Sequence, residues 1–191
     1  KLKKSKIFNK ILVSSDSAKI IKISKKAGAE VPFIRPTNLS GDYASSFNVI
    51  SHCVKYLNSK NYEFNYACCV YPVNPFLKIS DLKKGFNKVR KNKNSFVFSA
   101  VKYQFPFFRS FVFSKKKIKM IFSKNLKKRS QDLKQVMCDA GQFYWGNKKT
   151  WLKEKVSFSK NSEVIIIPKW RYHDIDTHDD WKKAEKIIDI I

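Results

Sequence analysis

Two kinds of hydrophobic spacing alternate along most of this chain. Short apolar runs, which are too short for helices, predict strands, and they occupy residues 10–14, 30–34, 66–71, 95–101, 142–145 and 164–167. Between several of them, apolar residues recur at helical spacing, with serine, threonine or glycine near the ends; the expected helices span about residues 20–28, 45–57, 80–89 and 178–190. This alternation predicts an α/β domain with a mostly parallel sheet, in which the run at 66–71 is buried on both faces.

The pattern changes in residues 104–122. They are rich in phenylalanine and β-branched residues, and Lys115-Lys116-Lys117 stands where a turn would join two strands. Because no helical spacing interrupts this segment, it indicates an antiparallel excursion. We therefore expect an α/β domain of residues 1–103 and 136–191, with an inserted β-rich lobe at residues 104–135.

The charge bears on the choice of partners. The chain has 40 lysine and arginine residues against 15 aspartate and glutamate residues, a net charge of +25, which would suit a nucleic acid. Only five of the basic residues are arginine, however, and the guanidinium group is preferred for reading bases and phosphates. The lysines are also spread along the whole chain, as an AT-rich coding sequence tends to produce. A solvated lysine surface is the better interpretation, and a nucleic-acid partner is not expected.

Cysteine usage and hydropathy indicate a cytoplasmic protein. The four cysteines form no Cys-x-x-Cys pair and are not spaced with the three histidines as zinc ligands would be, so reduced thiols are expected. No run approaches the roughly 18 apolar residues that cross a bilayer. No apolar signal core follows the basic start of the chain, and no membrane association is expected.

Asp174-Ile175-Asp176 is the most informative polar motif. In an extended segment, residues two apart point to the same side, so both carboxylates can face one hard cation. Mg²⁺ is typically held by one or two carboxylates together with substrate phosphates and waters. The alternative is that these acids only cap the last helix. Thr177 and Asp180 already satisfy a capping box, which leaves the two aspartates without that explanation, but the residues alone leave both interpretations open.

Other polar segments follow predicted strands, where open α/β sheets bind ligands. Arg35-Pro36 closes one strand, and Ser45-Ser46 stands at a helix N-terminus, a place that accepts anions or ring acceptors; an ordinary helix cap is the alternative. Tyr71-Pro72 bends the chain after another strand and could be only a turn. The remaining segments of this kind are Ser14-Ser15-Asp16, Gly141-Gln142 and residues 174–176.

Taken together, these motifs resemble those of the acylneuraminate (nonulosonate) cytidylyltransferases, enzymes that join CTP to a nine-carbon acidic sugar and release pyrophosphate. The resemblance runs from about Lys10 to the C-terminus. It rests on the order and spacing of three motifs: Val13-Ser14-Ser15-Asp16, Arg35-Pro36…Leu39-Ser40-x-Asp42-x-Ala44-Ser45-Ser46, and Asp174-Ile175-Asp176-Thr177-x-x-Asp180.

Two further motifs are similar to the pseudaminic acid branch of that family. Where the sialic acid enzymes have Gln-Pro-Thr-Ser-Pro, this chain has Tyr71-Pro72-x-x-Pro75-Phe76. Where they have Asn-Gly-Ala-Ile-Tyr, it has Asp139-Ala140-Gly141-Gln142-Phe143-Tyr144-Trp145-Gly146, preceded by Arg129-Ser130-Gln131-Asp132-Leu133. Sialic and legionaminic acid are the alternative sugars.

The resemblance implies a three-layer, Rossmann-like nucleotidyltransferase fold with a small antiparallel lobe that forms a homodimer. It also implies direct attack of the sugar's anomeric hydroxyl on the α-phosphorus of CTP, without a covalent enzyme intermediate. The implied site residues are Asp174 and Asp176, which would be catalytic by holding Mg²⁺; Arg35, Ala44, Ser45 and Ser46, for the nucleotide; and Tyr71, Arg129, Gln142 and Tyr144, for the sugar.

The sequence departs from the family pattern in a few places. The family opens with a strand and an Ala-Arg-Gly-Gly-Ser-Lys type loop that cradles the triphosphate. Nothing similar precedes Lys10, so a fragment of such an enzyme is expected. Val73, Asn74 and His173 also replace the family's usual residues. The alternatives to an active enzyme are a dimerising remnant without activity and a basic nucleic-acid-binding α/β protein.

Overall fold

The computed structural model describes residues 1–92, 96–103, 105–153 and 158–190, in two compact units. The first unit comprises Lys1–Pro72, Leu77–Phe98 and Gln142–Ile165. The second comprises Val73–Phe76, Ser99–Gly141 and Ile166–Ile191. Ser95 and Gln104, which begin an expected strand and the expected lobe, lie outside the described residues. The domain division at residues 104 and 135 stays a prediction.

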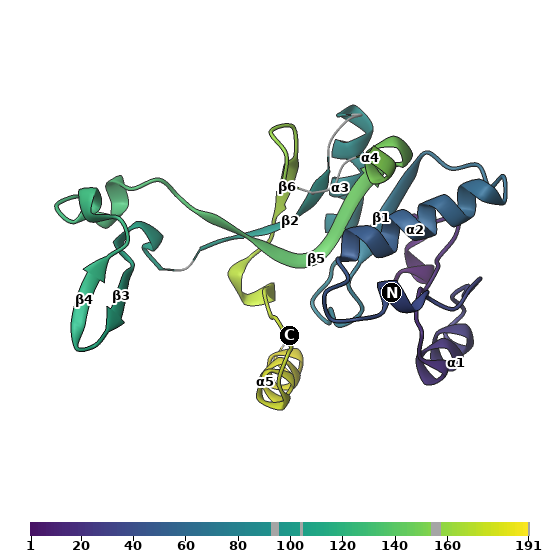
Figure 1. The fold of residues 1–191 in the computed structure, drawn as a ribbon, viewed down its shortest axis with the longest axis horizontal. Helices are drawn as coiled ribbons and strands as arrows, with labels where there is room; N and C mark the ends of the chain where they lie inside the picture. The colour runs from purple at the N-terminus through teal and green to yellow at the C-terminus, as the bar shows by residue number, and fades with distance from the viewer. Residues whose placement is uncertain (93–95, 104, 154–157, 191) are drawn as a thin grey trace. The chain divides into compact units, whose positions relative to one another are not determined.

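Four strands form one sheet in the order β1-β5-β2-β6 (Figure 1). Their bounds are β1 Tyr66–Val70, β2 Val97–Lys102, β5 Met137–Asn147 and β6 Glu163–Ile166. Strand β5 pairs antiparallel with β1. The N–H of Glu163 donates to the carbonyl of Phe96 at 2.9 Å. Four residues further along both strands, Ile167 donates to Ala100, also at 2.9 Å, and this equal advance marks a parallel pair. The expected α/β sheet, mostly parallel, is confirmed.

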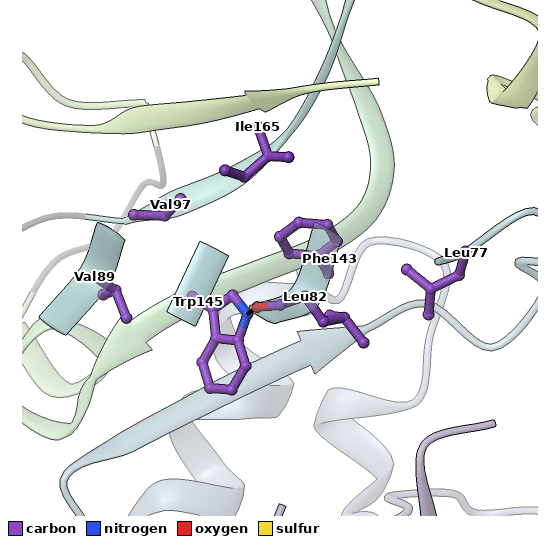
Figure 2. Packing of buried hydrophobic residues seen from close by; sticks show 7 residues of the cluster. All are labelled: Leu77, Leu82, Val89, Val97, Phe143, Trp145 and Ile165. Atoms are coloured by element: carbon purple, nitrogen blue, oxygen red, sulfur yellow. Dashed lines mark hydrogen bonds between the residues drawn. The ribbon is translucent and has the colours of Figure 1, made fainter. Parts of the chain in front are cut away.

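Helix α3 (Ile79–Lys91) covers one face of the sheet in the first unit. Its residues Leu82 and Val89 are fully buried and pack in one cluster with Phe143 and Trp145 of β5 (Figure 2). The indole N–H of Trp145 donates to the carbonyl of Leu82 at 3.1 Å. This bond satisfies the one polar atom of a side chain that is otherwise apolar and buried.

Helices α2 (Ser46–Ser59) and α4 (Lys148–Lys153) cover the opposite face. Successive residues of a strand point to opposite faces, so Tyr144 lies on this side, with its ring centroid 5.9 Å from that of Phe98. Phe47 of α2 lies 5.6 Å from Trp151 of α4, measured between ring centroids. The sheet therefore lies between two helical layers, and the expected three-layer arrangement is confirmed.

The expectation of full strands at residues 10–14 and 30–34 is wrong. In the described part of the chain these segments share one isolated parallel bridge, between Leu12 and Glu30. Pro32 explains why the pairing stops, because a proline has no N–H to donate and its φ is fixed. Helix α1 (Ala18–Lys26) joins the two segments. It ends just before Gly28, whose φ is 84°, and the sequence predicted a helix end at this glycine.

Strand β1 is less buried than its sequence suggests. Four of its five residues are half-buried, and Cys69 is the buried one. Residues of β1 nevertheless contribute to the hydrophobic clusters on both sides of the sheet, so both faces are covered, as expected, but incompletely. Strand β1 is first in the sheet order and pairs with β5 alone among the described strands. An edge strand is less completely covered than a central one, whatever its hydrophobicity.

The second unit contains an antiparallel hairpin of β3 (Phe111–Ser114) and β4 (Lys117–Met120), as the sequence predicts. Its two-residue turn, Lys115-Lys116, has φ values of 49° and 59°, which is the type I′ pattern that suits a hairpin. Helix α5 (His178–Ile188) begins with the expected capping box, in which Thr177 and Asp180 each accept a hydrogen bond from the other's backbone N–H.

Short 3₁₀ turns occur at Lys3–Ser5, Thr37–Leu39, Phe107–Arg109, Ser123–Asn125, Ser130–Asp132 and Lys169–Arg171. All four cysteines are free thiols, as expected. Among the helices of the described ranges, none combines the length and the apolar character that crossing a bilayer would take.

Candidate active site

Three of the expected nucleotide residues, Ala44, Ser45 and Ser46, lie at the start of α2 or directly before it, in the first unit. Ser45 is the N-cap of α2, and its hydroxyl accepts a hydrogen bond from the N–H of Asn48 at 3.2 Å. Ser46 is the first helical residue and is exposed, and Ala44 is half-buried. The ordinary cap considered from the sequence is therefore real. The first turn of a helix carries several N–H groups without an intrahelical partner, and the Ser45 hydroxyl caps one of them.

Arg35 is held against residues 14 and 15 by three hydrogen bonds. Its backbone N–H donates to the carbonyl of Ser15 at 3.0 Å. The side chain donates twice to Ser14, from Nε to the hydroxyl at 3.2 Å and from Nη2 to the carbonyl oxygen. A guanidinium group cannot lose its charge in a protein, so this half-buried side chain places a fixed positive charge beside the segment.

Cys53 of α2 lies near Ser14 and Arg35. Burial raises the pKa of its thiol, while a hydrogen bond with Ser14 and the charge of Arg35 oppose part of that shift. Sequence reasoning did not single out Cys53, and Ser14 entered only as part of a motif. No spacing rule could have found the pair, because Ser14 and Cys53 come from different segments and meet only in the fold.

Four of the expected residues come together at the carboxyl end of β1. The hydroxyls of Ser46 and Tyr71 are 2.9 Å apart, within hydrogen-bond distance. The N–H of Tyr71 donates to the carbonyl of Gln142 at 3.2 Å, and the rings of Tyr71 and Tyr144 are 5.6 Å apart between centroids. An expected nucleotide residue is thus in contact with an expected sugar residue.

The location of Gln142 corrects the sequence-based picture. Gly141-Gln142 was expected among the loop segments that follow strands, although Gln142 also began the expected strand at 142–145, and both residues lie inside the longer β5. Because β5 runs antiparallel to β1, a residue in its middle lies beside the end of β1. Gly141 has φ 58°, a left-handed conformation, and its N–H donates to Asp139 Oδ1 at 2.9 Å. Glycine suits this position, because a residue with a side chain pays about 1 kcal/mol to adopt that conformation.

Asp174 and Asp176 lie in the second unit, between the turn Lys169–Arg171 and α5. Both are exposed, whereas Ile175 between them is half-buried. This alternation agrees with two carboxylates on one side of an extended segment. Burial raises the pKa of nearby Tyr172, and the charges of neighbouring groups, Asp174 among them, add to the shift.

The chemistry of this pair fits a hard cation that also binds phosphates. In the described ranges no group of three or more histidine, cysteine, aspartate or glutamate side chains could hold a metal ion. Two exposed carboxylates are the ligand set typical of Mg²⁺ sites that are completed by substrate phosphates and waters. Capping of α5 uses Asp180, as expected, and so does not account for Asp174 and Asp176.

Arg129, an expected sugar residue, lies in the second unit, close to the hairpin in sequence. Its side chain is 70% exposed, and its Nε is 3.2 Å from Asp132 Oδ2. An exposed ion pair of this kind adds little stability, so local structure does not explain the presence of an arginine here.

Comparisons with known proteins agree with these motifs. A family model described as cytidylyltransferase matches residues 1–177. The pseudaminic acid cytidylyltransferase of Campylobacter jejuni subsp. jejuni serotype O:2 is 38% identical over 182 residues, which cover 95% of this chain and 78% of that protein.

A more distant relative and a solved structure are also similar to this chain, and the structure bears on the fold alone. A Helicobacter pylori protein named pseudaminic acid cytidylyltransferase and UDP-2,4-diacetamido-2,4,6-trideoxy-beta-L-altropyranose hydrolase is 31% identical, over 90% of this chain and 33% of its own length. A solved structure of CMP:2-keto-3-deoxy-manno-octonic acid synthetase complexed with CTP has a TM-score of 0.60 and 10% identity. It covers 94% of this chain and 80% of that one, and it shows the shared fold. This chain belongs to the cytidylyltransferase family.

Proposed function

We propose that this protein transfers the cytidylyl group of CTP to pseudaminic acid, a nine-carbon sugar acid. The anomeric hydroxyl oxygen of the sugar forms a bond to the α-phosphorus and loses its proton. The bond from that phosphorus to the oxygen bridging to the β-phosphate breaks, and pyrophosphate leaves. The observation that supports this most directly is the contact of Ser46 with Tyr71, which joins an expected nucleotide residue to an expected sugar residue.

The residues of the first unit bind and orient the two substrates. Arg35 and the start of α2 hold the cytosine, and Tyr71, Gln142 and Tyr144 contact the sugar. When both substrates are held side by side, the reaction no longer depends on a collision between two free molecules. This positioning supplies much of the rate enhancement in group transfer. The choice of pseudaminic acid follows from the names of the Campylobacter jejuni and Helicobacter pylori relatives and from the Tyr71 motif.

Asp174 and Asp176 would hold Mg²⁺. When bound, this ion neutralises the negative charge of the phosphates. The two carboxylates would bind and orient it, and their own negative charge would be balanced by the ion rather than repel the triphosphate.

The hairpin of β3 and β4 would form a homodimer. In the register of the hairpin, Phe111, Phe113, Ile118 and Met120 share one face. Phe113 and Ile118 on this apolar face are 67% and 66% exposed. A second copy of the chain would cover this face, and Arg129 would then reach the partner's site.

Pyrophosphate release tests the proposed reaction. The chain is incubated with CTP, pseudaminic acid and Mg²⁺, and compared with the double variant Asp174→Ala, Asp176→Ala. We expect release by the unchanged chain and a loss of about a hundredfold or more in the variant, since charge compensation at a phosphoryl group contributes several kcal/mol. Asp179→Ala is the matched control, because Asp179 is also exposed and acidic but lies on α5.

Three outcomes would count against the proposal. A folded chain that releases no pyrophosphate would point to the dimerising remnant. Equal release with sialic acid would contradict the choice of sugar. Activity that survives loss of both carboxylates would contradict the role of Asp174 and Asp176.

A further inference from the structure

The contacts of Arg35 determine which of its N–H groups can meet a ligand. Its Nε and Nη2 both donate to Ser14, to the hydroxyl and the carbonyl oxygen of the same residue. Nε and Nη2 lie on one edge of the planar guanidinium, so this edge is held as a two-point clamp. The backbone N–H of Arg35 donates to Ser15 at 3.0 Å, which fixes the base of the side chain as well. These bonds do not use Nη1.

The clamp has support from a third side. Cys53 of α2 lies close enough to Ser14 and Arg35 for the hydroxyl and the charge to oppose part of the rise in the pKa of its thiol. The Ser14 side chain therefore has a helix residue near it as well as the guanidinium that it accepts from. A side chain enclosed in this way has little freedom to turn, so Ser14 can restrain Arg35.

We propose that Ser14 is a positioning residue for base recognition: by clamping the Nε–Nη2 edge, it aims the remaining N–H groups of Arg35 at the cytosine and sets the preference for CTP over UTP. This inference rests on the proposed function, in which Arg35 contacts the base. Ser14 acts through Arg35 and does not itself touch the nucleotide.

The chemistry of the two bases explains why a restrained arginine would discriminate. Cytosine presents two neighbouring acceptors, O2 and N3. In uracil N3 carries a hydrogen and becomes a donor. A guanidinium group has donors only, so a fixed Arg35 that meets N3 of uracil would set donor against donor. A site built to hydrogen-bond one partner rejects strongly an analogue that leaves its polar groups unpaired. An unrestrained Arg35 could turn toward an oxygen of either base and would discriminate less.

The test is calorimetric binding of CTP and UTP, which does not depend on turnover. The chain is compared with Ser14→Ala, which removes the hydroxyl, and with Ser14→Thr, which keeps it. We expect the ratio of the UTP to the CTP dissociation constant to fall about tenfold or more in Ser14→Ala, as loss of one hydrogen bond to a charged group predicts. In Ser14→Thr, which keeps the hydroxyl, the ratio of the two dissociation constants should stay close to that of the unchanged chain.

Ser17→Ala is the matched control. The Ser17 hydroxyl accepts the N–H of Ile20 at the start of α1, so its loss should weaken that helix without changing the ratio. A purely structural role of Ser14 would weaken binding of both nucleotides equally and leave the ratio unchanged, and that result would overturn the inference. If Ser14→Ala does not fold, Ser14→Cys supplies a thiol that accepts hydrogen bonds only weakly, and the same fall in the ratio is expected.

The proposed function and this inference fail in different ways. An unchanged chain that binds CTP no better than UTP contradicts the proposed function and the inference with it. A chain that prefers CTP, and keeps the whole preference in Ser14→Ala, contradicts the inference alone.

Discussion

Phe143 and Phe113 both lie in hydrophobic strands, but their surroundings differ completely. Phe143 of β5 is fully buried in the first unit, among Leu82, Val97 and Trp145. Phe113 of β3 belongs to the second unit and is 67% exposed, although its strand is just as apolar. The hydrophobic pattern of the sequence alone would predict the same degree of burial for both phenylalanines. The difference lies in what covers each strand, since α3 packs against β5, whereas the whole of β3 is exposed.

This contrast separates two uses of apolar side chains. Burial within the chain contributes to the stability of the chain itself, at about 25 cal/mol for each Å² removed from water. An exposed apolar face contributes only when a partner covers it, and such faces mark interaction sites. We therefore expect the residues around Phe143 to determine folding, and the apolar face of the hairpin to determine self-association.

The largest expected effect is on the free energy of unfolding. Phe143→Ala should lower it by about 3–5 kcal/mol, as is typical for a buried phenylalanine that leaves a cavity. Phe113→Ala should change it by about 0.5 kcal/mol or less, measured at a concentration where the chain is monomeric. Urea denaturation of the two variants and the unchanged chain gives both values. Similar losses in the two variants would show that the hairpin is covered within the monomer, and the contrast would then fail.

The next effect is on dimerisation. Phe113 and Ile118 are directly opposite each other across the hairpin. The pair of substitutions Phe113→Asp and Ile118→Asp places two charges on the apolar face, and burial of unpaired charges is costly. We expect the dimer dissociation constant, measured by analytical ultracentrifugation, to rise about a hundredfold, which corresponds to about 2.7 kcal/mol.

Val112→Asp with Ser114→Asp is the matched control for that experiment. These residues lie on the other face of the same strand, so the added charge is equal but the apolar face stays intact. We expect little change in the dissociation constant. If both pairs of substitutions weaken the dimer equally, the effect is one of net charge and the apolar face is not the interface.

A smaller effect concerns the stability of the hairpin itself. Lys115 and Lys116 both have positive φ, which costs a residue with a side chain about 1 kcal/mol. Lys115→Asn with Lys116→Gly gives the sequence that type I′ turns prefer. The amides of β3 and β4 should then exchange with solvent more slowly, by about fivefold, if about 1 kcal/mol is gained locally. Unchanged exchange would mean that the ends of the hairpin, and not its turn, limit its opening.

Local signals in the sequence predicted the elements that depend on nearby residues. The start of the helix at 178–190 was correctly expected from Thr177 and Asp180, because a capping box spans only four residues. The hairpin was likewise expected from its lysine turn. The strands at 10–14 and 30–34 were overestimated, since their hydrophobicity is real but Pro32 limits their pairing.

The arrangement of the candidate site was less accessible to sequence reasoning. The motifs supplied Arg35 and Tyr71 as candidates, and their roles stay predictions. What they contact could not be predicted, because Ser14 is 21 residues from Arg35, and Ser46 is 25 residues from Tyr71. Gln142 lies beside Tyr71 only because β5 is antiparallel to β1. That pairing is set by the packing of the whole sheet.

The smallest expected effect tests stabilisation by polar groups on the surface, at the start of α5 in the second unit. Hydrogen bonds from the hydroxyl and backbone N–H of Thr177 lower the pKa of the Asp180 carboxyl below its ordinary value. A carboxyl whose pKa is lower in the folded state stabilises the protein above its unfolded pKa of about 3.9. That contribution is lost as the pH falls through the depressed folded value. Thermal unfolding at pH 7 should therefore show a lower melting temperature for Asp180→Asn than for the unchanged chain.

As the pH falls toward 2.5, this difference in melting temperature should narrow, because the carboxyl of the unchanged chain becomes protonated as the pH falls through its lowered folded pKa. Asp179→Asn is the control, since Asp179 lies in the same first turn but does not take part in the capping box. A gap for Asp180→Asn that stays constant from pH 7 to pH 2.5 would mean that the carboxylate charge does not stabilise α5. A gap that narrows would show that this turn depends on ionised polar groups, whereas the region around Phe143 depends on apolar burial and should respond to pH far less.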